Sequence, residues 1–327
     1  MPFPQPLKRS LQAGLQLLRS LLLRVKIARF TLTNRFGASP VVRTGGPVVS
    51  LTTHGHRINS VHLAIESIAH GSLLPSRLIL WLDDEKLFGT LQSELRRLQA
   101  RGLEVKLSKG YGPHTKYYPY VESEAEFKVP LATADDDILY PKHWLRRLVH
   151  AFEENSEVVN CCRARVVSFE KDKIAPYSHW HMCRSVRPSF LNFATGVSGV
   201  IYPPRFLEAL KQAGTAFEDR CPKADDIWLH AQALRTGHRI RQIQHRPVLF
   251  PRLPGTQEDG LKHGNVMTDG GNDRQASRTY TESDVQIMRS HANQHSTAEP
   301  RHPDMTVGQK IRTVWHAVIY GALTFLV

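Results

Sequence analysis

Acidic residues are missing from the start of this 327-residue sequence, where no Asp or Glu occurs before Glu66. Nine lysines and arginines precede Glu66, and the whole chain carries a formal net charge of +13. A basic excess of this size favours anionic partners such as nucleic acid, anionic lipid or phosphorylated substrates. The excess alone does not choose among these three classes of partner.

Three kinds of short motif are also missing. The four cysteines contain no CxxC pair, which argues against a zinc site and against a disulfide framework. There is no Asn-x-Ser/Thr glycosylation acceptor, so a reducing, cytoplasmic location is expected. The sequence also lacks GxxxxGK[ST], and a P-loop kinase is therefore not supported.

Both ends of the chain are predicted to be appendages of a central domain. Leucines recur at helical spacing near the start: Leu11, Leu15, Leu18 and Leu22. Residues 1–35 are therefore predicted to form a basic amphipathic helix, followed by a linker over 36–47. Residues 288–305 read as a tether, and 306–327 as an apolar helix too short to span a bilayer. The N-terminal helix either packs on its own domain or contacts the inner face of an anionic membrane peripherally.

Between these ends, over residues 48–287, predicted strands and helices alternate. Apolar strands at 48–51, 78–82 and 104–107 are each followed by a helical or loop segment. This alternation predicts an α/β fold, a single Rossmann-like domain with a mainly parallel central sheet. A fourth strand is expected at 127–132, where Pro130 suggests an edge or a bulge because proline cannot donate to the ladder.

The sharpest motif is a run of three aspartates, Asp135, Asp136 and Asp137, here called the aspartate triplet. In extended geometry Asp135 and Asp137 point to the same side. Two like charges about 4 Å apart repel by about 4 kcal/mol at an effective dielectric constant of about 20. A hard divalent cation such as Mg²⁺ or Mn²⁺ would relieve that repulsion. The alternative interpretation is a solvated turn that caps the next helix.

Two loops offer further groups for a nucleotide. The loop after the first strand, Thr-Thr-His-Gly-His-Arg at 52–57, can present backbone amides and a guanidinium. Lys116 lies among tyrosines after the third strand and could meet a diphosphate as a point charge. A polar turn and a loop of packed tyrosines are the respective alternatives.

In this order the segments resemble the GT-A glycosyltransferases, especially the family 2-like enzymes, over about residues 48–273. The resemblance implies a GT-A type domain, a nucleotide-sugar donor and Mn²⁺ or Mg²⁺ as cofactor. By position it implies a set of donor-binding residues: Thr52, Thr53, Arg57, Asp83, Lys116, Asp135 and Asp136. It also implies a set of metal ligands: Asp135, Asp137 and His263.

A second acidic pair, Asp225 and Asp226, begins a predicted helix over 224–235. Carboxylates are favoured at a helix N-terminus by its dipole, which is the structural alternative. The resemblance implies that Asp226 is the general base, with Asp225 as the second choice, in an inverting transfer. The acceptor is then a glycan or a lipid-linked molecule, as in cell-surface glycan synthesis. The small-residue segment 193–200 is expected near the acceptor and the sugar.

Two other functions are compatible with part of the pattern. Another magnesium enzyme, such as a nucleotidyltransferase, accounts for the aspartate triplet but not for the later acidic pair. A nucleic-acid-binding protein accounts for the charge, but the cations cluster in the N-terminal arm and no known reading motif occurs. We therefore expect a nucleotide-sugar donor as partner and no nucleic acid.

Overall fold

The structure is a computed structural model that describes residues 5–256 and 271–296. The chain divides into two compact units, residues 1–37 with 300–327, and residues 38–299. The described part of the first unit is helix α1 (Gln5–Phe36), where a helix was predicted. Among the described residues, no helix combines the length and the hydropathy needed to cross a bilayer. The helix predicted at 306–327 lies outside the described residues.

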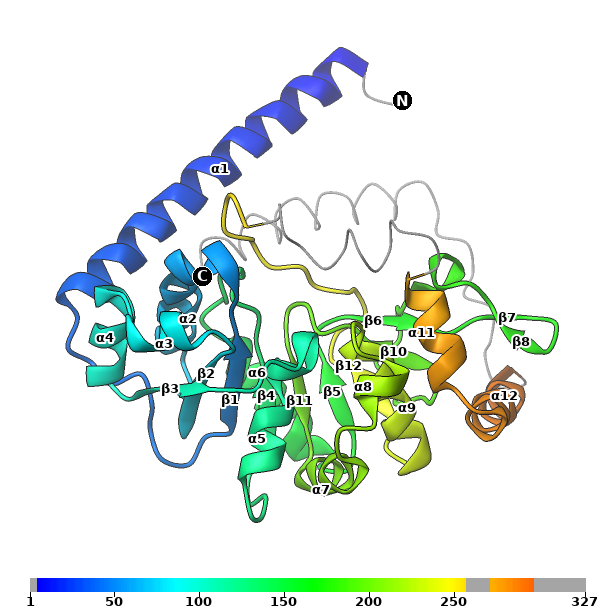
Figure 1. The fold of residues 1–327 in the computed structure, drawn as a ribbon. Coiled ribbons are helices and arrows are strands. Elements are labelled where there is room, and N and C mark those ends of the chain that lie inside the picture. Colours follow the sequence, from blue (N-terminus) through cyan, green and yellow to red (C-terminus); the bar gives the residue numbers. More distant parts are fainter. Residues whose placement is uncertain (1–4, 257–270, 297–327) are drawn as a thin grey trace. The chain divides into compact units, whose positions relative to one another are not determined.

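The second unit is built on a seven-stranded sheet with the strand order β12-β5-β11-β4-β1-β2-β3 (Figure 1). Its strands are β1 (Val48–Thr52), β2 (Arg77–Leu82), β3 (Leu103–Leu107), β4 (Leu131–Thr133), β5 (Val159–Cys161), β11 (Val200–Tyr202) and β12 (Ile240–Gln242). Only β11 runs antiparallel to its two neighbours in this sheet. The prediction of an α/β fold with a mainly parallel central sheet is confirmed.

Both faces of the sheet are buried, which explains why its strands read as continuous apolar runs. Along β2, Leu78, Leu80 and Leu82 point into one hydrophobic core, whereas Ile79 and Trp81 point into the other. The first core is covered by α2 (Val61–Ala69), α4 (Ser93–Ala100) and α6 (Trp144–Glu154). The second is covered by α5 (Tyr118–Ser123), α7 (Pro204–Ala213) and α9 (Asp225–Arg235).

The remaining described elements lie outside the central sheet. A three-stranded antiparallel sheet contains β6 (Ala164–Val166), β9 (His181–Met182) and β10 (Asn192–Ala194), and a two-stranded one contains β7 (Phe169–Glu170) and β8 (Lys173–Ile174). The other α-helices are α3 (Glu85–Gly89), α8 (Phe217–Arg220), α11 (Gly271–Thr279) and α12 (Glu282–Ser296). The 3-10 helices are η1 (Gly55–Asn59), η2 (Gly112–Lys116) and η3 (Tyr177–His179).

Two of the expected segment boundaries differ from the structure. The predicted linker at 36–47 is partly integrated in the domain, because Val41 is fully buried and its N–H donates to the Arg101 carbonyl over 2.9 Å. The predicted tether at 288–305 begins inside α12, where Met288 is fully buried and His291 is 7% exposed. In both places a few side chains contribute to packing that the composition of the segment does not reveal.

The fourth strand is also shorter than expected and is not at an edge. β4 lies between β11 and β1, so the expectation drawn from Pro130 was wrong. Pro130 immediately precedes the strand, and its carbonyl accepts a hydrogen bond from the Val48 N–H over 3.1 Å. Proline is tolerated here because the ladder uses its acceptor and not its missing donor.

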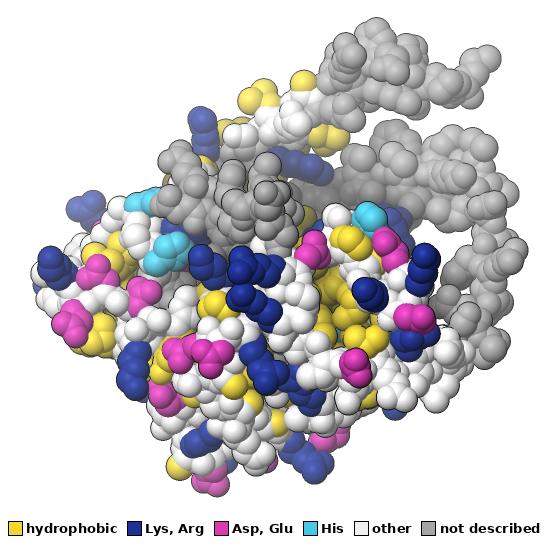
Figure 2. Space-filling model, turned by 45° about the vertical axis from the view of Figure 1, so that its right-hand side comes forward, with side chains coloured by type: hydrophobic (Ala, Val, Ile, Leu, Met, Phe, Trp, Pro, Cys, Tyr) yellow, Lys and Arg dark blue, Asp and Glu magenta, His cyan; other side chains and the backbone are white. Residues whose placement is uncertain are grey.

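The charges on the visible face of the molecule are mixed. Figure 2 shows Lys and Arg side chains distributed over this face with Asp and Glu side chains between them. On this face the basic excess therefore does not form a surface of a single sign.

Candidate active site

The sheet topology places the first loop and the aspartate triplet side by side. The chain leaves β1 toward β2 and β3, and then returns to β4 on the opposite side of β1. Such a reversal is a topological switch point, and ligands of open α/β sheets bind there at the carboxyl ends of the strands. Thr53 follows β1 at this end of the sheet. Ala134, which leads into the aspartate triplet, follows β4 and donates its N–H to the Ser50 carbonyl over 3.0 Å.

Asp136 is fixed by the loop after β1. Thr53 donates its hydroxyl to Asp136 Oδ2 over 2.7 Å, and Arg57 Nη1 donates to Asp136 Oδ1 over 3.0 Å. Thr53 and Asp136 are both buried, at 1% and 4% exposure. The structure thus brings together three of the predicted donor-binding residues. The Thr53 hydroxyl and Asp136 satisfy each other, so in this arrangement they hold the triplet in place.

Asp137 lies beside the same arginine, with 3.9 Å between its Oδ2 and Arg57 Nη1. Burial, followed by the charges of Asp135 and Asp136, raises the pKa of Asp137, while Arg57 and Arg252 act in the opposite direction. The backbone of this segment is fixed by Leu253, whose N–H donates to the Asp137 carbonyl over 2.7 Å. Asp137 is therefore a carboxylate that would gain stability from an additional cation.

Lys116 connects the aspartate triplet to the second acidic pair. Its Nζ donates to Asp135 Oδ1 over 2.9 Å and lies 3.9 Å from Asp225 Oδ2. Burial alone would lower the pKa of Lys116, but Asp135, Asp225 and Asp226 raise it well above its ordinary value. Lys116 is consequently a permanent cation between carboxylates that the sequence separates widely.

Asp226 is positioned by the small-residue segment that was expected near the sugar. The Gly196 N–H donates to Asp226 Oδ1 over 2.9 Å. A side chain at Gly196 would meet both Asp226 Oδ1 and Lys116 Nζ at 3.2 Å, so glycine leaves this space open. Burial, then the charge of Asp225, raises the pKa of Asp226 to about 8, although Lys116 and the Gly196 N–H lower it. At neutral pH this carboxyl is therefore mostly protonated.

His114 also supports this arrangement, although the sequence did not single it out. It is fully buried; one ring nitrogen lies 2.7 Å from the Cys221 carbonyl and the other 2.9 Å from the Tyr117 hydroxyl. Its ring also stacks on Phe217, with 4.0 Å between the centroids. These contacts join the loop that carries Lys116 to the segment that precedes Asp225. A histidine with two such partners gives no recognisable signal in a single sequence.

The other predicted site residues are less closely involved. The Thr52 hydroxyl donates to the Trp81 carbonyl over 3.2 Å, which ties β1 to β2. Asp83 is exposed at the carboxyl end of β2, and its side chain lies against Gly110. His263, the predicted late metal ligand, lies outside the described residues.

The donor set fits a metal ion that is shared with phosphate. Within the described residues, no group of three His, Cys, Asp or Glu side chains could hold an ion alone. Mg²⁺ and similar ions are usually held by one or two carboxylates together with substrate phosphates and water. Asp137 and Asp135 would provide these carboxylates, and a divalent ion would offset the burial and the repulsion from Asp135 and Asp136 that raise the pKa of Asp137.

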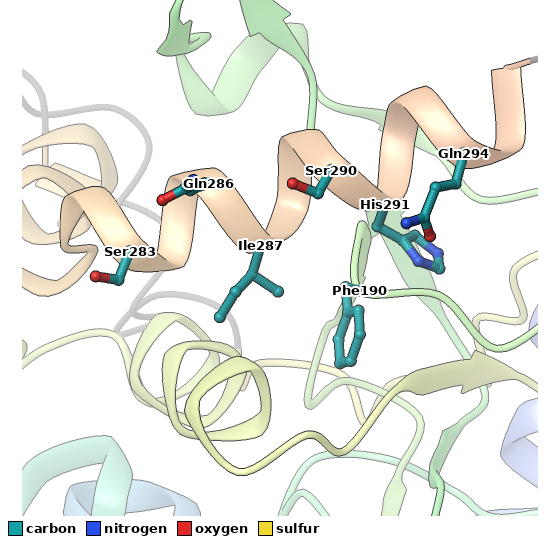
Figure 3. Close-up of a pocket in the computed structure, with 7 residues that line it drawn as sticks. All are labelled: Phe190, Ser283, Gln286, Ile287, Ser290, His291 and Gln294. Atoms are coloured by element: carbon teal, nitrogen blue, oxygen red, sulfur yellow. The ribbon is translucent and has the colours of Figure 1, made fainter.

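One hollow in the described part of the molecule lies away from these residues. It has a volume of about 450 Å³ and is lined by Phe190 and by α12 side chains (Figure 3). These side chains are Ser283, Gln286, Ile287, Ser290, His291 and Gln294. The hollow is an open trough, and none of the predicted site residues lines it.

Comparisons with known proteins were made by sequence and by structure. No family model and no curated protein matches the sequence. A mannosyltransferase from Pyrobaculum calidifontis, in complex with GDP-Man and Mn²⁺, aligns with 94% of this chain and 92% of its own, at 10% identity and a TM-score of 0.45. S. aureus TarS, residues 1–349, aligns with 81% and 77%, at 14% identity and a TM-score of 0.43.

A third similar structure is a CMP:2-keto-3-deoxy-manno-octonic acid synthetase complexed with CTP. It aligns with 60% of this chain and 88% of its own, at 11% identity and a TM-score of 0.36. All three TM-scores are below 0.5, so these likenesses do not decide the function.

Proposed function

We propose that the protein is a metal-dependent glycosyltransferase that moves a sugar from a nucleoside-diphosphate sugar to an acceptor hydroxyl, with inversion. The observation that carries this proposal is the chain of contacts at the strand switch point. It runs from the aspartate triplet through Lys116 to the acidic pair on α9. These contacts support one continuous site that would bind the nucleotide at one end and accept a proton at the other.

The donor end supplies charge and position. Asp137, with Asp135, would hold Mn²⁺ or Mg²⁺ against the diphosphate. A bound divalent ion neutralises the negative charge that develops on a leaving diphosphate. Arg57 and the Asp136–Thr53 pair keep the aspartate triplet in one orientation, so little reorganisation is needed when the donor binds.

The acceptor end supplies the base. Asp226 would take the proton of the acceptor hydroxyl as that oxygen attacks the sugar. A general base is most effective when its pKa lies near the working pH, and burial brings the pKa of Asp226 to about 8. The Gly196 N–H holds one carboxylate oxygen and stabilises the ionised form.

The first test is a screen of nucleotide sugars in the presence of Mn²⁺. A ligand that binds only the native state raises the melting temperature. We expect one nucleotide sugar to raise it and to be split slowly by water into free sugar and nucleoside diphosphate. Product analysis by chromatography separates this outcome from the nucleotidyltransferase alternative. Consumption of a nucleoside triphosphate with release of pyrophosphate, and no splitting of any nucleotide sugar, would refute the transferase proposal.

We also propose peripheral attachment of α1 to the inner face of an anionic membrane, where a lipid-linked acceptor would be found. α1 contains no acidic residue, and several of its apolar side chains are exposed: Leu17, Leu18, Leu21, Val25 and Leu32. A basic residue near an anionic membrane surface contributes about 1 kcal/mol, and salt screens this contribution.

Vesicle sedimentation tests the attachment. The full-length protein should bind vesicles that contain anionic lipid at low salt, and raising the salt should weaken this binding. Deletion of residues 1–35 should reduce binding while leaving the melting temperature shift caused by the nucleotide sugar unchanged. If neutral and anionic vesicles retain equal amounts of protein, or if the deletion has no effect, the attachment does not occur through α1.

A further inference from the structure

Two arginines emerge together from the small antiparallel sheet. Arg163 immediately precedes β6 and Arg165 lies within it, so their side chains leave the same face of an extended segment. Arg163 Nη1 donates to the Thr195 hydroxyl over 2.8 Å, and Arg163 Nη2 lies 3.5 Å from Met182 Sδ. The backbone is fixed at the same point, because the Thr195 N–H donates to the Arg163 carbonyl over 3.0 Å.

Arg165 is held in a similar way by neutral groups. Its Nη1 donates to the Trp180 carbonyl, and its guanidinium lies over the ring of Tyr177, 4.9 Å from the centroid. Its Nε is buried and has no hydrogen-bond partner in the described part of the chain. Both arginines are half-buried. No carboxylate in the described residues makes an ion pair with either guanidinium.

This arrangement differs from that of other arginines in the described residues. Arg57, Arg77, Arg101 and Arg235 are each paired with a carboxylate at 3.0 Å or less. Arg163 instead loses hydration without a directly paired acid: burial lowers its pKa, the charges of Arg165 and Arg252 lower it further, and Tyr177 and the more distant Asp226 raise it. A guanidinium is a planar fork of N–H donors that matches a carboxylate or a phosphate. A half-buried pair whose described partners are neutral is therefore preorganised for an anion.

The position of the pair indicates which substrate carries that anion. Arg163 bonds to Thr195, and the next residue, Gly196, donates its N–H to Asp226. The pair is thus connected to the end of the site that holds the proposed base. Lys116 and Arg57, by contrast, donate hydrogen bonds to the aspartate triplet.

We propose that Arg163 and Arg165 bind a phosphate or carboxylate group of the acceptor and thereby place its hydroxyl beside Asp226. This inference rests on the proposed function, which it deepens by assigning an anionic acceptor. A lipid-linked phosphate and an acidic or phosphorylated sugar share this chemistry. The pair acts by positioning, because the proton transfer itself is assigned to Asp226.

The test is titration calorimetry on the full chain, saturated with a nucleoside diphosphate and Mn²⁺. The probes are glucose 6-phosphate, glucuronate, dodecyl phosphate and the neutral methyl glucoside. At least one anionic probe should bind at least about 10-fold more tightly than the neutral one, and the preferred anion distinguishes a lipid phosphate from a sugar acid. Arg163→Gln and Arg165→Gln should each remove that preference. Arg163→Lys should restore part of it, because the charge remains while the fork is lost.

Arg205→Gln is the matched control, because Arg205 is an exposed arginine on α7 that pairs with Glu157. It removes the same charge and should leave all affinities unchanged. Nucleoside diphosphate affinity should stay within about twofold in every variant, which also shows that each variant is folded.

Three results would overturn the inference. The first is equal affinity for anionic and neutral probes in the wild type. The second is an anion preference that survives both glutamine substitutions. The third is a parallel loss of nucleoside diphosphate binding, which would assign the arginines to the donor. If the wild type binds no nucleoside diphosphate but still shows an anion preference that Arg163→Gln removes, the proposed function fails and the anion site stands.

Discussion

Replacing Asp226 with Asn should lower the rate of sugar transfer by about 100- to 10,000-fold, the usual contribution of a general base. Asparagine keeps the size of the side chain and can still accept the Gly196 N–H, but it cannot take the proton of the acceptor. Donor affinity should remain within a few fold, because Asp137, Lys116 and Arg57 are unchanged. Steady-state kinetics, combined with calorimetry of nucleoside diphosphate binding, separates the two effects.

The pH dependence of the rate gives a sharper test of the same assignment. Because burial raises the pKa of Asp226 to about 8, its reactive, ionised form increases as the pH rises through that value. Transfer by the wild type should therefore increase between pH 6 and about 9, whereas the residual activity of Asp226→Asn should lack this rise. If Asp226→Asn keeps both the wild-type rate and the increase of the rate with pH (the rising limb), Asp226 is not the general base.

Asp225→Asn is the matched control on the same helix. The charge of Asp225 contributes to the raised pKa of Asp226, so its removal should move the rising limb to lower pH. The maximal rate should fall much less than in Asp226→Asn. The reverse ranking of the two variants would assign the base to Asp225.

The fold was largely predictable because its strongest signals are local. The apolar runs at β1 and β2 are buried on both faces, and β3 alternates buried Leu103 and Val105 with half-buried polar residues, so the extent of all three strands could be read from the sequence to within one residue at each end. β4 was less accurate, since only Leu131–Thr133 pairs and the preceding residues approach the sheet as loop. Segment ends such as Met288 were missed, because one buried side chain in a polar stretch leaves little periodicity.

The site was predictable as a set of residue types but not as a set of contacts. Asp136 and Thr53 are separated by 83 residues, and nothing in the sequence indicates that they bond to each other. The sequence predicts that both bind the donor, and the structure joins them in one buried pair. The pairing of Lys116 with Asp135 and the lack of an acid near Arg163 likewise depend on tertiary structure. Sequence patterns identify where charges occur, and the fold determines which of them remain to meet a ligand.

Replacing Asp137 with Ala should abolish the metal dependence of nucleoside diphosphate binding. In the wild type, Mn²⁺ should strengthen binding by at least about 10-fold, or about 1.4 kcal/mol. The physical reason is that Asp137 is buried beside the carboxylates of Asp135 and Asp136. A divalent ion is attracted by the negative charge of Asp137 and relieves the repulsion among the three carboxylates. Calorimetry with and without a chelator measures the difference. Asp172→Ala, at an exposed position that pairs with Arg289, removes the same group elsewhere and should retain the full metal effect.

Acidification should reproduce the effect of the Asp137 substitution in the wild type. A proton and the metal ion compete for Asp137, and its pKa is raised, so protonation begins at a higher pH than for an ordinary aspartate. The Mn²⁺-dependent part of the affinity should therefore decline as the pH falls, while the metal-independent part, due to Arg57 and Lys116, persists. In Asp137→Ala the affinity should show no such metal-dependent decline. Equal affinities with and without Mn²⁺ in both proteins, at every pH, would mean that the aspartate triplet is a structural turn, stabilised by Arg57 and Lys116 rather than by a metal.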